Sequence, residues 1–222
     1  MATSPNSPAP SLEGERRLLN ANLRLTGREQ PVETGEALAP STRRAARRAP
    51  TSPQSGVPAP DLVDRLPRRA AALPATVWWL GVHGGAGEST LAALASGSRP
   101  ADHAWPIPTA NVTAHHVVLV ARTNYSGLRA AQRAATEWAA NTLPQSISLA
   151  GLVLIADAPG RRPKPLRDLE MVIAGGVPRV WHLPWVNAWR FGPASSTDPL
   201  PKEFDQLFAD LSLTTSSTHA QN

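Results

Sequence analysis

Four apolar runs after residue 75 predict buried strands. They cover residues 76–82, 116–121, 149–156 and 179–183. Within 117–120 and 152–155 the apolar residues are continuous instead of alternating with polar ones. Continuous runs are typical of strands covered on both faces, as in parallel sheets. We therefore expect a mostly parallel sheet between two layers of helices.

The segments between these runs have helical spacing. The predicted helices cover 89–95, 127–140, 165–174 and 201–211. Ser126 is the expected N-cap of the second helix, and Pro165 is well placed in the first turn of the third. Alternating strands and helices indicate an α/β fold of three layers with right-handed crossovers. Residues 97–114 hold three prolines and are expected to form a loop.

The front of the chain has a different composition. The first 77 residues contain no aromatic side chain and are rich in Pro, Ala, Ser and Arg. Such a segment buries too little apolar surface to offset the entropy lost on ordering. We expect a long disordered N-terminal arm over 1–70, an α/β domain over 71–212 and a disordered tail over 213–222.

The positive charge is concentrated in this arm. Residues 1–75 carry eleven Arg against seven acidic residues, whereas the remainder carries eleven basic residues against ten acidic ones. Arg43, Arg44, Arg47 and Arg48 are therefore candidate contacts to nucleic acid. A solvated linker explains the same composition and is the simpler interpretation.

The composition also excludes several classes of chemistry. The chain has no Cys, which excludes disulfides, thiolate nucleophiles and Cys-ligated metals. No apolar run approaches the roughly 18–20 residues of a transmembrane segment. The N-terminus lacks the features of a signal peptide. We expect a cytoplasmic protein.

The most informative motif follows the first apolar run. The letters HGGAGEST at 83–90 lie between a predicted strand and a predicted helix. This is the layout of a loop whose backbone N–H groups surround a phosphate. The candidate nucleotide-binding residues of this loop are Gly84, Gly85, Ala86, Gly87, Glu88, Ser89 and Thr90.

The motif resembles the deviant phosphate loop of the ParA/MinD family of partition and positioning ATPases, whose pattern is K-G-G-x-G-K-[ST]. The resemblance implies a P-loop NTPase-like fold, here reduced in size, with ATP and Mg²⁺ as cofactors and a homodimer as one assembly. Ser89 matches the hydroxyl that would ligate Mg²⁺. The chain is also similar to a group of uncharacterised actinobacterial proteins that share this loop and a Pro/Trp-rich C-terminal motif.

Two positions depart from the pattern of the family. His83 stands where the signature lysine would be, and Glu88 stands where the phosphate-binding lysine would be. A unit charge about 4 Å from a phosphate contributes on the order of 1–4 kcal/mol, so reversing its sign should greatly weaken triphosphate binding. The leading hypothesis is a catalytically impaired ParA/MinD-like protein. This hypothesis favours a protein without enzymatic activity, although the sequence leaves ATP hydrolysis open. The protein would act as a binding or regulatory partner of another protein, in DNA partition, plasmid transfer or positioning.

Asp157 is a second candidate site residue. It ends an apolar strand in the sequence Asp157-Ala158-Pro159-Gly160, a form that supplies a Mg²⁺ ligand in nucleotide hydrolases. Together with Ser89 it could hold Mg²⁺, while Arg161 or Arg162 replaces the missing lysine. That alternative makes the chain an active nucleotide-binding switch. An ordinary strand-ending turn explains the same residues.

Two further patterns have more than one interpretation. Ser89, Asp157 and His182 follow the chain order of an α/β-hydrolase triad, but the oxyanion motif would overlap the nucleophile, which argues against an esterase. Residues 180–191 hold four aromatic side chains and end in Arg190-Phe191. They are either a recognition surface or part of the core.

Overall fold

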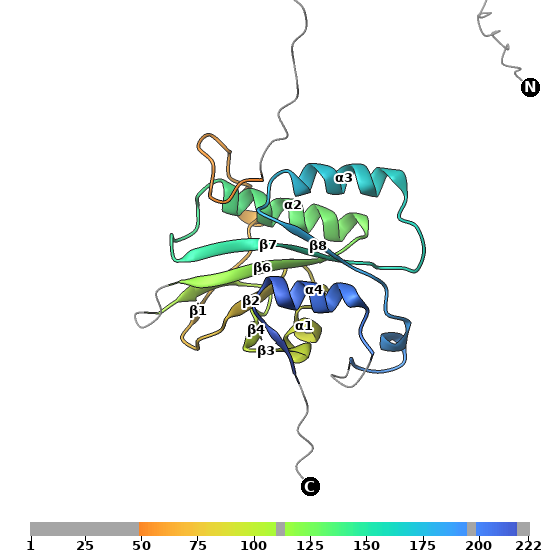
Figure 1. The fold of residues 1–222 in the computed structure, drawn as a ribbon. Coiled ribbons are helices and arrows are strands. Elements are labelled where there is room, and N and C mark those ends of the chain that lie inside the picture. The colour runs from red at the N-terminus through yellow and green to blue at the C-terminus, as the bar shows by residue number, and fades with distance from the viewer. Residues whose placement is uncertain (1–48, 110–113, 195–198, 217–222) are drawn as a thin grey trace, which may run out of the picture. The chain divides into compact units, whose positions relative to one another are not determined.

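The computed structural model describes residues 49–109, 114–194 and 199–216 (Figure 1). Five parallel strands form its central sheet in the order β4-β2-β6-β7-β8. Their bounds are β2 Val77–Gly81, β4 Ser98–Pro100, β6 His115–Arg122, β7 Ile147–Ile155 and β8 Val180–Leu183. All four predicted strands are present, and the expected α/β fold with a mostly parallel sheet is confirmed.

Helices cover both faces of this sheet. Figure 1 shows α2 and α3 on one face and α1 and α4 on the other. Their bounds are α1 Glu88–Leu94, α2 Tyr125–Ala139, α3 Lys164–Ala174 and α4 Lys202–Asp210. Each face has its own apolar core, and β2 contributes to both because successive side chains of a strand point to opposite faces. Trp78 packs in the core beneath α2, whereas Trp79 packs in the core with Phe204 of α4.

The predicted loop at 97–114 contains strands instead. Besides β4, it contributes β5 (Trp105–Pro108), which pairs in parallel with β1 (Arg68–Ala71). The prediction was wrong because prolines are tolerated in short edge strands, where a missing N–H costs little. Trp105 is completely buried and anchors this small sheet in the core. Residues 110–113 lie outside the described residues.

The predicted boundary of the disordered arm is also wrong for residues 49–70. The N–H of Gln54 donates to the carbonyl oxygen of Ala139 (2.9 Å), and the N–H of Leu66 donates to Glu137 Oε2 (3.1 Å). A short 3₁₀ helix, η1 (Leu62–Asp64), lies between these two contacts in sequence. The segment is therefore held by polar contacts to α2, a signal that apolar periodicity does not carry. Residues 1–48, with Arg43, Arg44, Arg47 and Arg48, lie outside the described residues.

The predicted disordered tail likewise begins too early. β9 (Thr214–Thr215) pairs antiparallel with β3 (Ala95–Ser96), and the N–H of Ser216 donates to the carbonyl oxygen of Leu94. Backbone pairing of this kind needs no particular side chains, so the sequence offers little to predict it. Residues 217–222 lie outside the described part. Across the described ranges, no helix has the length and apolar composition that crossing a bilayer requires.

Candidate functional site

The motif at 83–90 forms a turn between β2 and α1, as its glycines predict, together with the first three residues of that helix. Gly85 and Gly87 have φ angles of 73° and 109°, in the left-handed region that favours glycine. A Cβ atom on Gly87 would also lie 2.7 Å from Cδ1 of Ile155. The turn therefore requires glycine both for its backbone conformation and for its close approach to β7.

Glu88, the first residue of α1, turns its side chain back toward the strand. The residue is only 4 % exposed, and its Oε2 accepts a hydrogen bond from the N–H of Gly81 at 2.7 Å. Gly81 is the last residue of β2. The carboxylate that replaces the lysine of the ParA/MinD pattern is thus fixed at the base of the turn.

His103 completes this arrangement from the loop after β4. Its Nδ1 lies 2.7 Å from the carbonyl oxygen of Gly81 and 3.3 Å from Oε1 of Glu88. Both of these oxygens only accept hydrogen bonds, so Nδ1 carries the proton. A Cβ atom on Gly81 would lie 3.0 Å from both Cδ of Glu88 and Cε1 of His103, which explains the glycine. We refer to these three residues as the Gly81–Glu88–His103 cluster.

The backbone that carries His103 is strained. Asp102 and His103 have φ angles of 52° and 57°, values that are uncommon outside glycine. Such residues persist only where the surroundings hold them, and they gather at sites of function. The sequence did not identify His103 as a site residue because no recognisable motif surrounds it. A histidine within the proline-containing segment 97–114 was the one feature that could have drawn attention to it.

The cluster does not suit a nucleoside triphosphate. The position from which a lysine would offset the phosphate charge holds an acid, and that acid is held by the backbone of Gly81 and the ring of His103. A carboxylate at this place opposes an incoming phosphate instead of attracting it. We therefore derive no phosphoryl-transfer step through this loop.

His83 joins the turn to the neighbouring strand. Its Nε2 accepts a hydrogen bond from the N–H of Arg122 at 3.0 Å, and its Nδ1 lies 2.9 Å from the carbonyl oxygen of Gly84. The ring is thus used in holding the turn against the end of β6. Ser89, the candidate Mg²⁺ ligand, is exposed on the first turn of α1.

Asp157 lies just beyond the carboxyl end of β7, and β6 separates that strand from β2. Its Oδ1 accepts a hydrogen bond from the hydroxyl of Thr123 at 2.8 Å, and no hydrogen bond joins it to Ser89 within the described ranges. Coordination of Mg²⁺ by these two residues stays a prediction. His182 contacts Glu170, so the order Ser89, Asp157, His182 does not correspond to a hydrogen-bonded triad.

Two arginines lie near Asp157. Arg122 donates through Nη1 to the carbonyl oxygen of Ala156 (2.9 Å) and through Nε to that of Gly85 (3.3 Å). Burial lowers the pKa of the Arg122 guanidinium, and the Asp157 carboxylate opposes this shift. Burial also lowers the pKa of Arg162, which forms an ion pair with Glu170. Both shifts start from a very high value, so these side chains remain cationic at neutral pH.

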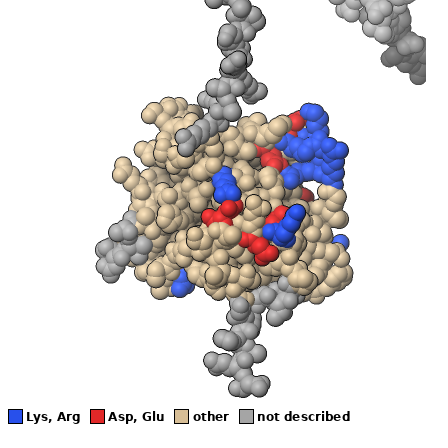
Figure 2. Space-filling view, in the orientation of Figure 1, with Lys and Arg blue, Asp and Glu red and all other residues tan. Residues whose placement is uncertain are grey.

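Arg162 belongs to a run of basic residues that follows β7. Figure 2 shows Lys and Arg side chains gathered at the upper right, where Figure 1 places the N-terminal end of α3. The chain carries Arg161, Arg162, Lys164 and Arg167 over this segment. In α/β sheets, ligands and partners bind at the carboxyl ends of parallel strands. The basic residues lie at that end of β7.

The aromatic motif at 180–191 divides between core and surface. Trp181 is buried, and its Nε1 donates to Oδ2 of Asp210 at 2.9 Å. Trp189, in the 3₁₀ helix η2 (Asn187–Arg190), packs edge-on against Phe204. Phe191 is 84 % exposed. The core interpretation therefore holds for Trp181 and Trp189, whereas a recognition role for Phe191 stays a prediction.

Comparison with known proteins places the chain in a family without assigning an activity. No curated protein and no solved structure matches it significantly. A model described as a family of unknown function, DUF6668, matches residues 75–204. The match includes the turn at 83–90, all of the central sheet and the cluster at Gly81. It spans more than half of the sequence, and the chain therefore belongs to this family of unknown function, DUF6668.

Proposed function

We propose that the chain is a catalytically impaired, P-loop-like protein of the ParA/MinD type that acts by binding another protein. The observation that carries this proposal is the burial of Glu88 and its hydrogen bond to the N–H of Gly81. The turn has the glycines of a phosphate loop, but its own carboxylate occupies the base. Such a protein keeps the backbone shape of a nucleotide-dependent switch but lacks the positive charge that would bind the phosphates.

Exposed side chains that follow the carboxyl ends of the strands support the second part of the proposal, the binding of another protein. Tyr125, which follows β6, is 65 % exposed, and Phe191, which follows β8 and η2, is 84 % exposed. Exposed aromatic and arginine side chains are frequent anchors of protein interfaces. Arg161, also exposed, follows the intervening strand β7. A second copy of the chain is one partner that such a surface would fit.

Calorimetry on the full chain tests the proposed loss of nucleotide binding. We expect no saturable heat with Mg·ATP or Mg·GTP up to millimolar concentration. Glu88→Lys tests the charge itself, because gain of binding would show that the backbone of the turn can still hold phosphates. Micromolar, Mg²⁺-dependent binding by the unaltered chain, or ATP turnover abolished by Ser89→Ala, would contradict the proposal.

Sedimentation velocity tests the homodimer. We expect concentration-dependent self-association that weakens when Tyr125 and Phe191 are both replaced by Ser, because both positions are exposed. Arg129→Gln, on the exposed side of α2, serves as a control that should leave association unchanged. A monomer at all concentrations would direct the search to a different protein.

A nucleotide-binding switch is the second candidate, and Arg122 favours it. Its guanidinium contacts the carbonyl oxygen of Gly85 within the turn and lies near Asp157. A cation from the neighbouring strand would then replace the absent lysine. In that case Arg122→Gln abolishes the nucleotide binding seen by calorimetry, whereas Arg129→Gln does not.

A further inference from the structure

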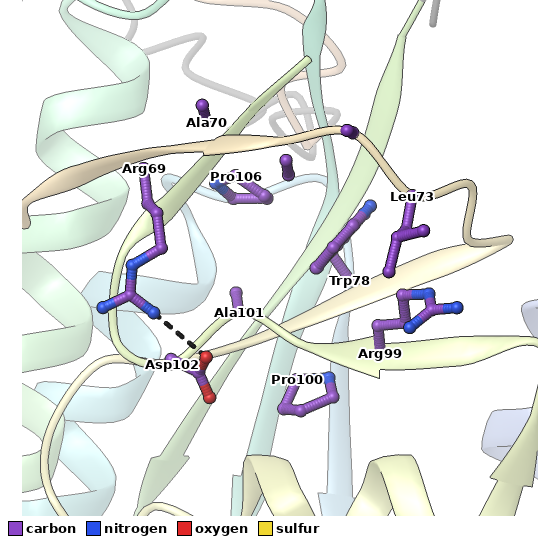
Figure 3. Close-up of a pocket in the computed structure, with 11 residues that line it drawn as sticks. Arg69, Ala70, Leu73, Trp78, Arg99, Pro100, Ala101, Asp102 and Pro106 are labelled. Carbon is purple, nitrogen blue, oxygen red and sulfur yellow. Dashed lines mark hydrogen bonds and ion pairs between the residues drawn. The ribbon is translucent and has the colours of Figure 1, made fainter. Parts of the chain in front are cut away.

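A cavity of about 340 Å³ lies between β1 and the segment that follows β4, on the side of Trp78 (Figure 3). Ala70, Ala71 and Pro106 line it from the β1–β5 pair, and Pro100 and Ala101 line it from the opposite side. Its volume is near the lower end of the range for small-molecule sites, about 300–1,000 Å³. The space suits a compact ligand and is too small for a dinucleotide.

Charged side chains stand at two ends of this apolar space. Figure 3 shows Arg99 beside Leu73 and Trp78 at one end and the Arg69–Asp102 ion pair at the other. Asp102 neutralises one of the two arginines, so the lining has a net charge of +1. Arg99 uses its Nε to donate to the carbonyl oxygen of Pro74 at 3.1 Å, and this contact orients its guanidinium.

The indole of Trp78 lines the cavity with its apolar atoms. The residue is 7 % exposed, and its buried Nε1 has no partner among the described residues. Because this nitrogen has no accessible surface, a ligand in the cavity contacts the carbon atoms of the ring instead. The indole lies at the same end of the cavity as Arg99. An anion held by Arg99 would therefore leave its apolar part against the ring.

From these observations we infer that the cavity binds a small apolar monocarboxylate. Its carboxylate lies beside Arg99, and its apolar body packs against the indole of Trp78 and fills the space between Pro100 and Pro106. The inference is independent of the proposed function, because none of the lining residues belongs to the turn at 83–90. The site is nevertheless next to the Gly81–Glu88–His103 cluster in sequence, since Asp102 precedes His103.

Nuclear magnetic resonance tests this site on the full chain labelled with ¹⁵N in its tryptophan indoles. The signal of Trp78 is assigned by its loss in Trp78→Phe. Phenylacetate and hexanoate are the probes, and phenylacetamide is the uncharged control. We expect at least one of the two carboxylates to shift the Trp78 signal saturably, and phenylacetamide to bind at least tenfold more weakly than phenylacetate.

Variants then separate charge recognition from general apolar binding. Arg99→Gln should weaken carboxylate binding at least tenfold, and Arg129→Gln on α2 should not change it. Leu73 is exposed at the rim, so its substitutions should leave the fold intact. Leu73→Glu should weaken binding about fivefold and Leu73→Lys should strengthen it. No saturable shift with either carboxylate, equal affinity for phenylacetamide, or insensitivity to the charge at both positions 99 and 73 would overturn the inference.

Discussion

The N–H of Gly81 donates to the Glu88 carboxylate across the turn that joins β2 to α1, at 2.7 Å. This contact explains why an acid is tolerated where the ParA/MinD pattern has a lysine. The acid does not lie in solvent above the turn. It satisfies a backbone donor at its base, and the ring of His103 contacts its other oxygen.

Gly81→Ala should disrupt this contact, because the added Cβ would lie 3.0 Å from both Glu88 and His103. We expect a loss of stability of about 1–3 kcal/mol from the overpacking, measured by urea denaturation. Gly84→Ala is the matched control, since nothing lies within 4 Å of its Cβ position. Equal stability of the two variants would show that Glu88 and His103 move aside without cost.

Glu88 itself should contribute to stability through the hydrogen bond it accepts. Glu88→Ala leaves the N–H of Gly81 without its partner and should cost about 1–3 kcal/mol, whereas Glu88→Gln retains an acceptor and should cost less. Thermal unfolding compares the two variants. Asp205→Ala, at an exposed position of α4, controls for loss of a negative charge. If Glu88→Ala left the stability unchanged, water would be accepting the hydrogen bond of the Gly81 N–H in place of the carboxylate.

The sequence predicted the sheet and its helices because those elements depend on apolar periodicity. The runs at 117–120 and 152–155 are buried on both faces, as their continuity indicates. The turn at 83–90 was found because its glycines carry a conformational requirement. These features are local, so one stretch of sequence contains them.

The rest of the site depends on contacts between residues far apart in the chain. His103 lies fifteen residues after Glu88 and reaches the cluster through a strained backbone conformation that no local pattern indicates. The direction of the Glu88 side chain was equally inaccessible, because the same residue could have faced solvent. The packing of residues 49–70 was missed for the same reason.

Glu137 accounts for much of that packing. It is completely buried on α2, and its Oε2 accepts hydrogen bonds from Nε1 of Trp105 (2.9 Å) and from the N–H of Leu66 (3.1 Å). Glu137→Leu leaves both donors unpaired, so we expect a loss of about 2–4 kcal/mol. Glu137→Gln keeps an acceptor oxygen and should therefore cause a smaller loss of stability than Glu137→Leu. Limited proteolysis should cut residues 49–66 faster in Glu137→Leu than in Glu137→Gln, and equal rates would contradict the assigned role.

The N-cap of α2 provides a direct comparison between prediction and structure. Ser126 was the expected cap, but the Asn124 side chain accepts from the N–H of Gly127 at 2.8 Å. The helix begins at Tyr125, two residues before the predicted start at residue 127. Asn124→Ala should therefore lower the free energy of unfolding by about 1 kcal/mol, and Ser126→Ala should change it by much less. Chemical denaturation of the two variants decides which residue is the cap.

His182 should make stability depend on mildly acidic pH. Burial lowers the pKa of its ring, and the Arg162 guanidinium lowers it further. The unfolded chain therefore binds the proton first as the pH falls below about 6.5, the ordinary value for histidine. The contribution of His182 to stability is fully present above that pH and is lost as the pH decreases toward the pKa of the folded state.

The ring of His182 is half exposed, so solvent screening keeps the effect below about 1 kcal/mol. Thermal unfolding between pH 7.5 and 5.5 should show a smaller decrease for His182→Gln than for the unaltered chain, with His116→Gln as the control at an exposed position of β6. A His182→Gln variant with an unchanged pH dependence would assign the acid sensitivity to other groups.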